Sequence, residues 1–206
     1  MRILAFLILT VQSFLAGAAV AAPAKPADTQ TAVLAGGCFW GVEGVFERMR
    51  GVRSVVSGYA GGDSSTANYE KVGTGRTGHA ESVQITFDPK QVSYADILRV
   101  FFSVAHDPTQ LNRQGPDTGP QYRSAIFYAN DAQRNLARSY IAELNKSGKF
   151  RRAIVTRVDP LEAFYAAENY HQDYIVKNPR SPYVVMHDLP KIREFKRLYP
   201  EYYREP

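Results

Sequence analysis

The stretch that decides the fold is residues 31–49, TAVLAGGCFWGVEGVFERM. Its first five residues are mostly apolar, which predicts a buried strand over residues 31–35. Apolar side chains then recur at the i, i+3, i+4, i+7 spacing of an amphipathic helix, at Val42, Val45, Phe46 and Met49. The glycine-bearing residues 36–41 join the two elements, so the sequence places Cys38 at a strand-to-helix junction.

Further strands and helices follow this junction. Apolar patterns predict strands at residues 52–57, 83–87, 124–129 and 153–158. Helices are expected after the capping residue Ser93, along Leu136, Tyr140, Ile141 and Leu144, and from near Pro190. Loops rich in glycine or proline are expected at residues 58–62 and 107–121.

The order strand, helix, strand, strand, helix, strand is typical of the split βαβ arrangement in ferredoxin-like folds. We therefore predict an α/β (α+β) two-layer sandwich with a mixed sheet, appended helices and an extended C-terminal segment. The chain has 206 residues, 45% of them hydrophobic. This is enough for one well-buried core, so a single domain over residues 31–206 is expected.

The first residues are typical of a secretory signal peptide. Arg2 precedes an apolar run, and Ala19-Val20-Ala21 offers an A-x-A cleavage site. We expect a signal peptide over residues 1–21, a flexible leader over residues 22–30, and a secreted or periplasmic protein. Polar residues interrupt the apolar run, which is short for the roughly 20 residues of a membrane span, so no span is expected after cleavage.

Charge and cysteine content narrow the function classes. The formal net charge is +5, and cleavage after Ala21 removes one positive charge, from Arg2. This mild, scattered excess does not indicate nucleic-acid binding. The single cysteine excludes an intramolecular disulfide. The four histidines lack metal-ligand spacing, so we expect no metal. We also expect a monomer.

Cys38 is the main candidate for chemistry. Taken without context, a lone cysteine is more often an inert core residue. At a helix N-terminus, however, unpaired N–H groups and the helix dipole favour an anion, which predicts a lowered thiol pKa. The adjacent Phe39 and Trp40 would supply an apolar wall beside this nucleophile.

The surroundings of Cys38 resemble the A-type peptide methionine sulfoxide reductases, whose signature is Gly-Cys-Phe-Trp-Gly followed by an amphipathic helix. Further matching motifs stand in the family's order at residues 58–62 (GYAGG), 77–81 (TGHAE), 106–109 (HDPT), 117–124 (DTGPQYRS) and 167–172 (AENYHQ). The resemblance covers roughly residues 31–175 and makes chance convergence implausible. It implies a peptide-methionine (S)-S-oxide reductase that repairs oxidised proteins or free methionine sulfoxide.

The resemblance assigns the two chemical roles to Cys38 and Glu81. Oxide is a poor leaving group, so thiolate attack on the sulfoxide sulfur requires a proton donor at the oxygen. By resemblance, Cys38 is the nucleophile and Glu81 is the acid. Because Glu81 immediately precedes an apolar strand, partial burial and a raised pKa are expected.

The remaining site residues are also assigned by resemblance. Tyr69 and Tyr122 are implied to hydrogen-bond the sulfoxide oxygen, and Asp117 to orient neighbours or help regenerate the enzyme. Phe39 and Trp40 are implied to form the pocket for the substrate's S-methyl group. The resemblance implies no bound cofactor.

Regeneration is where the sequence departs from the family. Attack leaves Cys38 as a sulfenic acid. Many relatives carry a resolving cysteine soon after the tyrosine that matches Tyr183, but no cysteine follows here. We therefore expect an external thiol, from a thioredoxin-fold protein or a small molecule, to reduce Cys38.

Two other functions stay open at this point. A cysteine acyl hydrolase would use Cys38 activated by His79 or His171. A non-catalytic protein could bind methionine-containing peptides through Phe39 and Trp40. The glutamate and tyrosine set favours the reductase, because it suits protonation of an oxide.

Overall fold

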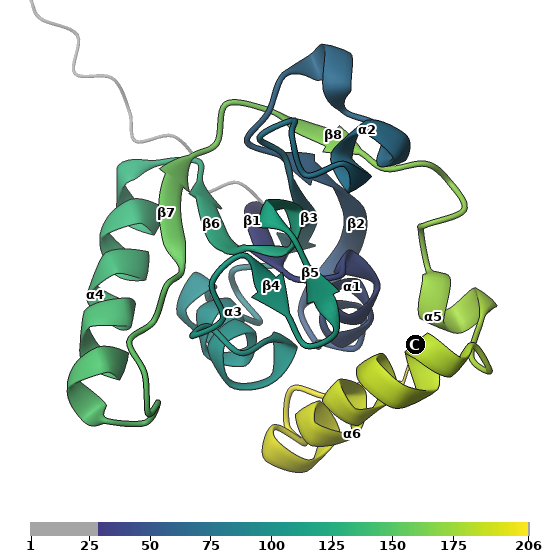
Figure 1. Cartoon of the computed structure of the whole chain (residues 1–206). Helices are drawn as coiled ribbons and strands as arrows, with labels where there is room; N and C mark the ends of the chain where they lie inside the picture. Colours follow the sequence, from purple (N-terminus) through teal and green to yellow (C-terminus); the bar gives the residue numbers. More distant parts are fainter. Residues whose placement is uncertain (1–28, 206) are drawn as a thin grey trace, which may run out of the picture.

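The computed structural model describes residues 29–205, which are organised around a six-stranded sheet (Figure 1). The strands lie in the order β7-β6-β1-β3-β2-β8. The inner strands are β1 (Gln30–Gly36), β2 (Val52–Ala60), β3 (Ala80–Phe87) and β6 (Ser124–Tyr128). The edge strands are β7 (Arg157–Pro160) and β8 (Phe164–Ala166).

The strand directions confirm the ferredoxin-like prediction. β1 is antiparallel to β3 and β6, and β2 is antiparallel to β3. Consequently β1 and β2 are parallel with β3 between them, and β3 and β6 are parallel with β1 between them. These are the two split βαβ units. The parallel pairing of β6 with β7 makes the sheet mixed, as expected.

Helices connect and cover these strands. The longer ones are α1 (Phe39–Glu47), α3 (Tyr94–Val100), α4 (Asp131–Ser147) and α6 (Leu189–Leu198), and the short ones are α2 (Tyr69–Gly73) and α5 (Tyr174–Lys177). Figure 1 shows α4 along β7 at one edge, with α5 and α6 toward the other side, where both contact α1. A small hairpin, β4 (Arg113–Gln114) and β5 (Asp117–Thr118), lies in the predicted loop.

The local chemistry explains where the main helices begin. Ser93 caps α3 as predicted, since its hydroxyl accepts from the Asp96 N–H and the Asp96 carboxylate accepts from the Ser93 N–H. α3 continues as a π-helical turn over Phe101–Ala105. α6 begins at Leu189 with a proline in its first turn, which confirms the helix expected near Pro190.

The main core lies between the sheet and the helices. Alternate residues of β1 face opposite sides, so Leu34 belongs to the larger hydrophobic cluster and Val33 to a smaller one. The helical side chains buried in the larger cluster include Val42, Val45, Phe46, Ile97 and Leu98. Burying this apolar stripe of α1 fixes the direction in which its first turn points.

Several predicted boundaries were wrong. The residues expected in a loop at 58–60 belong to β2, because they pair with both β3 and β8. Gly58 permits this close approach, since a Cβ there would lie 2.3 Å from the Tyr165 carbonyl oxygen. β7 begins at Arg157 rather than residue 153, because Val155 donates its N–H to the Pro108 carbonyl instead of pairing with β6.

The N-terminal predictions mostly fall outside this structure. The expected signal peptide at residues 1–21 and most of the expected leader at residues 22–30 lie outside the described residues. Within residues 29–205, no helix is both long enough and apolar enough to cross a bilayer.

Candidate active site

One cavity brings together all seven residues singled out in the sequence. Its volume is about 200 Å³, and its lining consists of Cys38, Phe39, Trp40, Tyr69, Glu81, Asp117, Tyr122 and Tyr183. These residues come from the start of α1, the start of α2, strands β3 and β5, a 3-10 turn at Pro120–Tyr122, and the segment before α6. The fold therefore assembles the site from segments that are far apart in the chain.

Cys38 is the N-cap residue of α1, at the position expected from the sequence. Its side chain is nearly closed off, with the residue 8% exposed. Burial raises the thiol pKa well above its ordinary value, and the charges of Glu81 and Asp188 raise it further, while the Trp40 backbone amide and Lys191 oppose them. The expectation of a lowered thiol pKa was therefore wrong, because desolvation outweighs the helix terminus.

Glu81 lies within β3 and not before it, because this strand begins at Ala80, three residues earlier than the predicted start at residue 83. Its Oε2 accepts the Phe39 N–H at 3.1 Å, and the residue is only 3% exposed. Burial raises the pKa of Glu81 to about 8, against the opposing effect of the Phe39 hydrogen bond. At neutral pH this carboxyl group is mainly protonated, so it can act as a proton donor to the pocket that it lines.

Three tyrosine hydroxyls line the same cavity. Burial, followed by the charge of Glu81, raises the pKa of both Tyr69 and Tyr122, so both stay neutral hydrogen-bond donors. The third, Tyr183, was not predicted as a site residue, and its hydroxyl donates to the Asp117 carboxylate. The one sequence signal that pointed toward Tyr183 was its match to a tyrosine that many relatives carry shortly before a resolving cysteine.

Trp40 forms an ordered aromatic wall. Its ring stacks on Tyr174 with centroids 3.6 Å apart and meets the edge of Tyr183 at 5.7 Å. Its indole Nε1 donates to His171 Nδ1 at 3.1 Å. The contacts with Tyr174 and His171 were not predicted, because residues more than 130 positions away leave no local pattern near Trp40.

A buried charge pair lies behind the first turn of α1. Asp188 is fully buried, and neither of its carboxyl oxygens has a hydrogen-bond partner among the described residues. Lys191 Nζ lies 3.6 Å away. A Cβ at Gly41 would lie 2.3 Å from Asp188 Oδ1, so the glycine makes room for this carboxyl group. Burial raises the pKa of Asp188 to about 6, with Lys191 opposing the shift.

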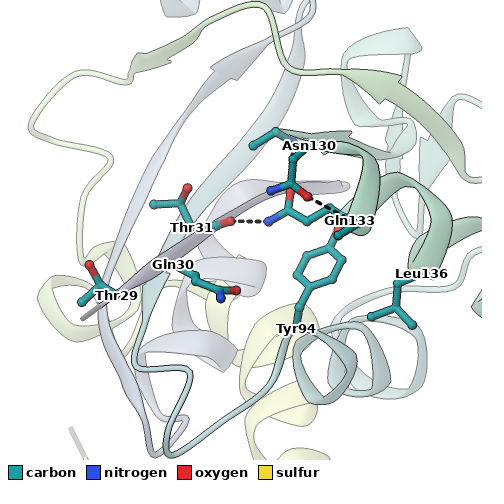
Figure 2. Close-up of a pocket in the computed structure, with 9 residues that line it drawn as sticks. Thr29, Gln30, Thr31, Tyr94, Asn130, Gln133 and Leu136 are labelled. Atoms are coloured by element: carbon teal, nitrogen blue, oxygen red, sulfur yellow. Dashed lines mark hydrogen bonds between the residues drawn. The ribbon is translucent and has the colours of Figure 1, made fainter. Parts of the chain in front are cut away.

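A larger hollow lies elsewhere, where β1 begins beside α4 (Figure 2). Its volume is about 430 Å³, and it shares no lining residue with the cavity at Cys38. Gln133 closes one side by donating from its side chain to the Thr31 carbonyl at 2.7 Å and from its N–H to Asn130 at 2.9 Å. Its lining holds no cysteine, histidine or carboxyl group, so the cavity at Cys38 is the candidate reactive site.

The acyl-hydrolase alternative finds no matching arrangement. His79 Nε2 contacts the Asp63 carbonyl at 3.0 Å, and His171 Nδ1 is engaged with Trp40, so neither imidazole lines the cavity with Cys38. A cysteine hydrolase would need such a pair. Across residues 29–205, no group of three or more His, Cys, Asp or Glu side chains is arranged to hold a metal ion.

Comparisons with known proteins show the family to which the chain belongs. The family model described as peptide methionine sulfoxide reductase matches residues 30–202. Peptide methionine sulfoxide reductase MsrA 2 of Mesorhizobium japonicum is 56% identical over 177 residues, which cover 86% of this chain and 91% of the relative.

Solved structures give the same picture. The reduced form of Mxr1 from Saccharomyces cerevisiae is 37% identical with a TM-score of 0.67, over 76% of this chain and 90% of that one. Methionine sulfoxide reductase A of Corynebacterium diphtheriae is 38% identical with a TM-score of 0.65, over 77% and 78%.

The charge pair behind α1 makes a test of Cys38 ionisation possible. Because Asp188 raises and Lys191 lowers the thiol pKa, Asp188→Asn is expected to speed alkylation of Cys38 by iodoacetamide at pH 7 by about threefold or more. Lys191→Met is expected to slow it. Near-ultraviolet circular dichroism checks the fold, and a shift of both variants in the same direction would contradict this electrostatic account.

Proposed function

Because the chain belongs to the peptide methionine sulfoxide reductase family, we propose that its reaction proceeds through Cys38 and Glu81. The protein is an oxidoreductase that reduces methionine sulfoxide by a thiol-dependent mechanism. One observation carries the assignment of residues: a thiol and a protonated carboxyl group line the same cavity of about 200 Å³. A sulfoxide in this cavity could meet the thiol at its sulfur and the proton of the carboxyl group at its oxygen at the same time.

In the proposed step, the Cys38 sulfur attacks the sulfoxide sulfur while Glu81 gives its proton to the oxygen. The thiol proton passes to Glu81, and an S–S bond joins the two sulfurs in the protonated adduct. The hydroxyl then moves to the Cys38 sulfur as the S–S bond and the S–O bond of the substrate sulfur break, which leaves a sulfenic acid and the thioether. The substrate is reduced to the thioether and the cysteine is oxidised by the same two electrons. A neutral Glu81 also favours formation of the Cys38 thiolate, because a carboxylate at residue 81 would repel the negative charge on the sulfur.

The tyrosines and the aromatic wall supply orientation. We propose that Tyr69 and Tyr122 donate hydrogen bonds to the sulfoxide oxygen, where negative charge develops. Phe39 and Trp40 would receive the S-methyl group. With the oxygen held by the tyrosines and the methyl group held by the aromatic pair, only the S epimer would present its sulfur to Cys38. Asp117 would act by holding Tyr183, whose hydroxyl it accepts.

The proposed substrates are free methionine sulfoxide and oxidised methionine residues in proteins. We propose that the enzyme acts as a monomer, and light scattering of the purified protein would test that state. No part of the proposed step calls on a bound cofactor.

The nucleophile and the acid can be tested in one assay. With dithiothreitol as reductant, the wild type should consume only the S epimer of a methionine sulfoxide peptide, and Cys38→Ser should abolish turnover. Glu81→Gln keeps an acceptor for the Phe39 N–H but loses the proton, so kcat should fall by about 100-fold or more. Because the acid form of Glu81 is required and its pKa is about 8, the wild-type rate should fall as the pH rises through that value.

Two results of this assay would contradict the assignment. Consumption of the R epimer would remove the proposed selectivity. If Glu81→Gln keeps full activity and its rate still falls at high pH as in the wild type, Glu81 is not the proton donor.

We propose that an external thiol completes the cycle, because the chain has a single cysteine. The incoming thiol sulfur bonds to the Cys38 sulfur, water leaves, and a second thiol then releases Cys38 from the mixed disulfide. A thioredoxin-fold protein supplies both thiols. A thioredoxin that lacks its second cysteine should be trapped on substrate-oxidised enzyme through Cys38, as seen by mass spectrometry. If the sulfenic acid persists in the presence of such a trap, this partner is excluded.

We propose that the protein is exported, on the basis of Arg2, the apolar run after it, and Ala19-Val20-Ala21. Protein recovered from the periplasm or medium should then begin at Ala22. Recovery of cytoplasmic protein that still starts at Met1 would contradict export. The single thiol would in that case face a reducing compartment, where external reductants are more abundant.

A further inference from the structure

His171 lies behind Trp40 and is not part of the cavity lining. Its Nδ1 is 3.1 Å from the indole Nε1 of Trp40. An indole nitrogen can only donate, so Nδ1 must be the acceptor. An imidazole can accept at Nδ1 only in its neutral form with the proton on Nε2, which makes the contact specific for one protonation state.

The other ring nitrogen of His171 makes no hydrogen bond that would compete with the contact to Trp40. His171 is 2% exposed, and its Nε2 has no hydrogen-bond partner among the described residues. Aromatic rings surround it instead, with centroids at 4.4 Å for Tyr69, 4.2 Å for Tyr170 and 5.0 Å for Phe39. The ring therefore has one polar contact, and that contact is with Trp40.

The loop that carries His171 is tied down on both sides. Gln172 accepts from the Ser57 N–H and donates to the Ser57 carbonyl, each at 2.9 Å. Glu168 accepts from the Tyr69 N–H at 2.9 Å and from the Tyr59 hydroxyl at 2.8 Å. A loop fixed in this way holds the His171 imidazole in place. The hydrogen bond to its Nδ1 then restricts the position of the Trp40 indole.

We propose that neutral His171 is a positioning residue that holds the Trp40 indole in place as the pocket wall, and that protonation of the imidazole releases it. Protonation would put a second N–H against the indole N–H, which leaves two donors facing each other. The inference rests on the proposed role of Trp40 in receiving the S-methyl group. His171 would act only through Trp40 and would not touch the reacting atoms.

The surroundings set the pH at which release occurs. Burial lowers the pKa of His171 below its ordinary value of 6.5, and the charge of Glu168 opposes this shift. Tyr69 and Tyr170 are the other titratable groups that face the ring, and both have raised pKa values, so they stay neutral in this range. The neutral, accepting imidazole therefore predominates at neutral pH, and release requires acid.

Trp40 provides the readout, because it is the only tryptophan in the chain. Its fluorescence should change as the pH of the wild type falls below 6.5, and this change should be lost in His171→Gln, whose amide oxygen accepts without titrating. His187→Gln is the matched control, since it removes another imidazole near the same wall, which lies against Tyr183 with ring centroids 4.9 Å apart. This control should keep the change.

The kinetic arm separates positioning from mere stability. His171→Phe keeps an aromatic ring but has no acceptor, so its KM for a methionine sulfoxide peptide at pH 7.5 should rise about tenfold with little change in kcat. His171→Gln should restore KM toward the wild-type value. Circular dichroism confirms that each variant is folded.

Three results would overturn the proposal: a wild-type emission that does not change in acid, a change that persists in His171→Gln, or a folded His171→Phe with the wild-type KM. The fluorescence arms need no turnover and no folded His171→Phe. They therefore decide the contact between His171 and Trp40 even if the proposed roles of Cys38 and Glu81 fail.

Discussion

The hydrogen bond from the Phe39 N–H to Glu81 Oε2 is the contact on which the site depends. It joins the first turn of α1 to the middle of the sheet, because Glu81 is held in β3 between two neighbouring strands. An N-terminal N–H group of a helix needs an acceptor, and here the acceptor is also the acid that we propose for the reaction. One bond thus satisfies the helix end and sets the nucleophile and the proton donor beside each other.

Burial then determines the protonation states in this part of the molecule. The environment that raises the pKa of Glu81 to about 8 also raises that of the Cys38 thiol. Burial therefore makes Glu81 a good proton donor and keeps the Cys38 thiol from ionising. The thiol gains reactivity from the positive helix end, from Lys191 and from loss of the negative charge at Glu81. Reactivity at Cys38 is a property of the assembled pocket and not of the α1 terminus alone.

Much of this arrangement could be predicted from the sequence, for a physical reason. The apolar periodicities are strong where an element buries one face, so the four inner strands and α1, α3 and α4 were found. The short elements α2, α5 and β8 bury too little for a periodic signal. Their positions depend on tertiary contacts, such as the pairing of Phe164–Ala166 with the end of β2. The seven site residues came from the family resemblance, and His171 lies in one of its motifs. The contact of His171 with Trp40 and the place of Asp188 behind α1 arise from long-range packing that no local pattern records.

The cavity joins Cys38 near the start of the fold to Tyr183 near its end, and Asp188 of the same C-terminal segment lies behind α1. Contacts between residues so distant in sequence form late during folding, because a long loop must close first. Until the last segment has docked against α1, the thiol lacks part of the shield that it has in the native state. In an oxidising compartment, ambient oxidants can therefore react with the exposed Cys38 thiol before the chain has finished folding. The speed of C-terminal docking sets how many molecules reach the native state with a usable nucleophile.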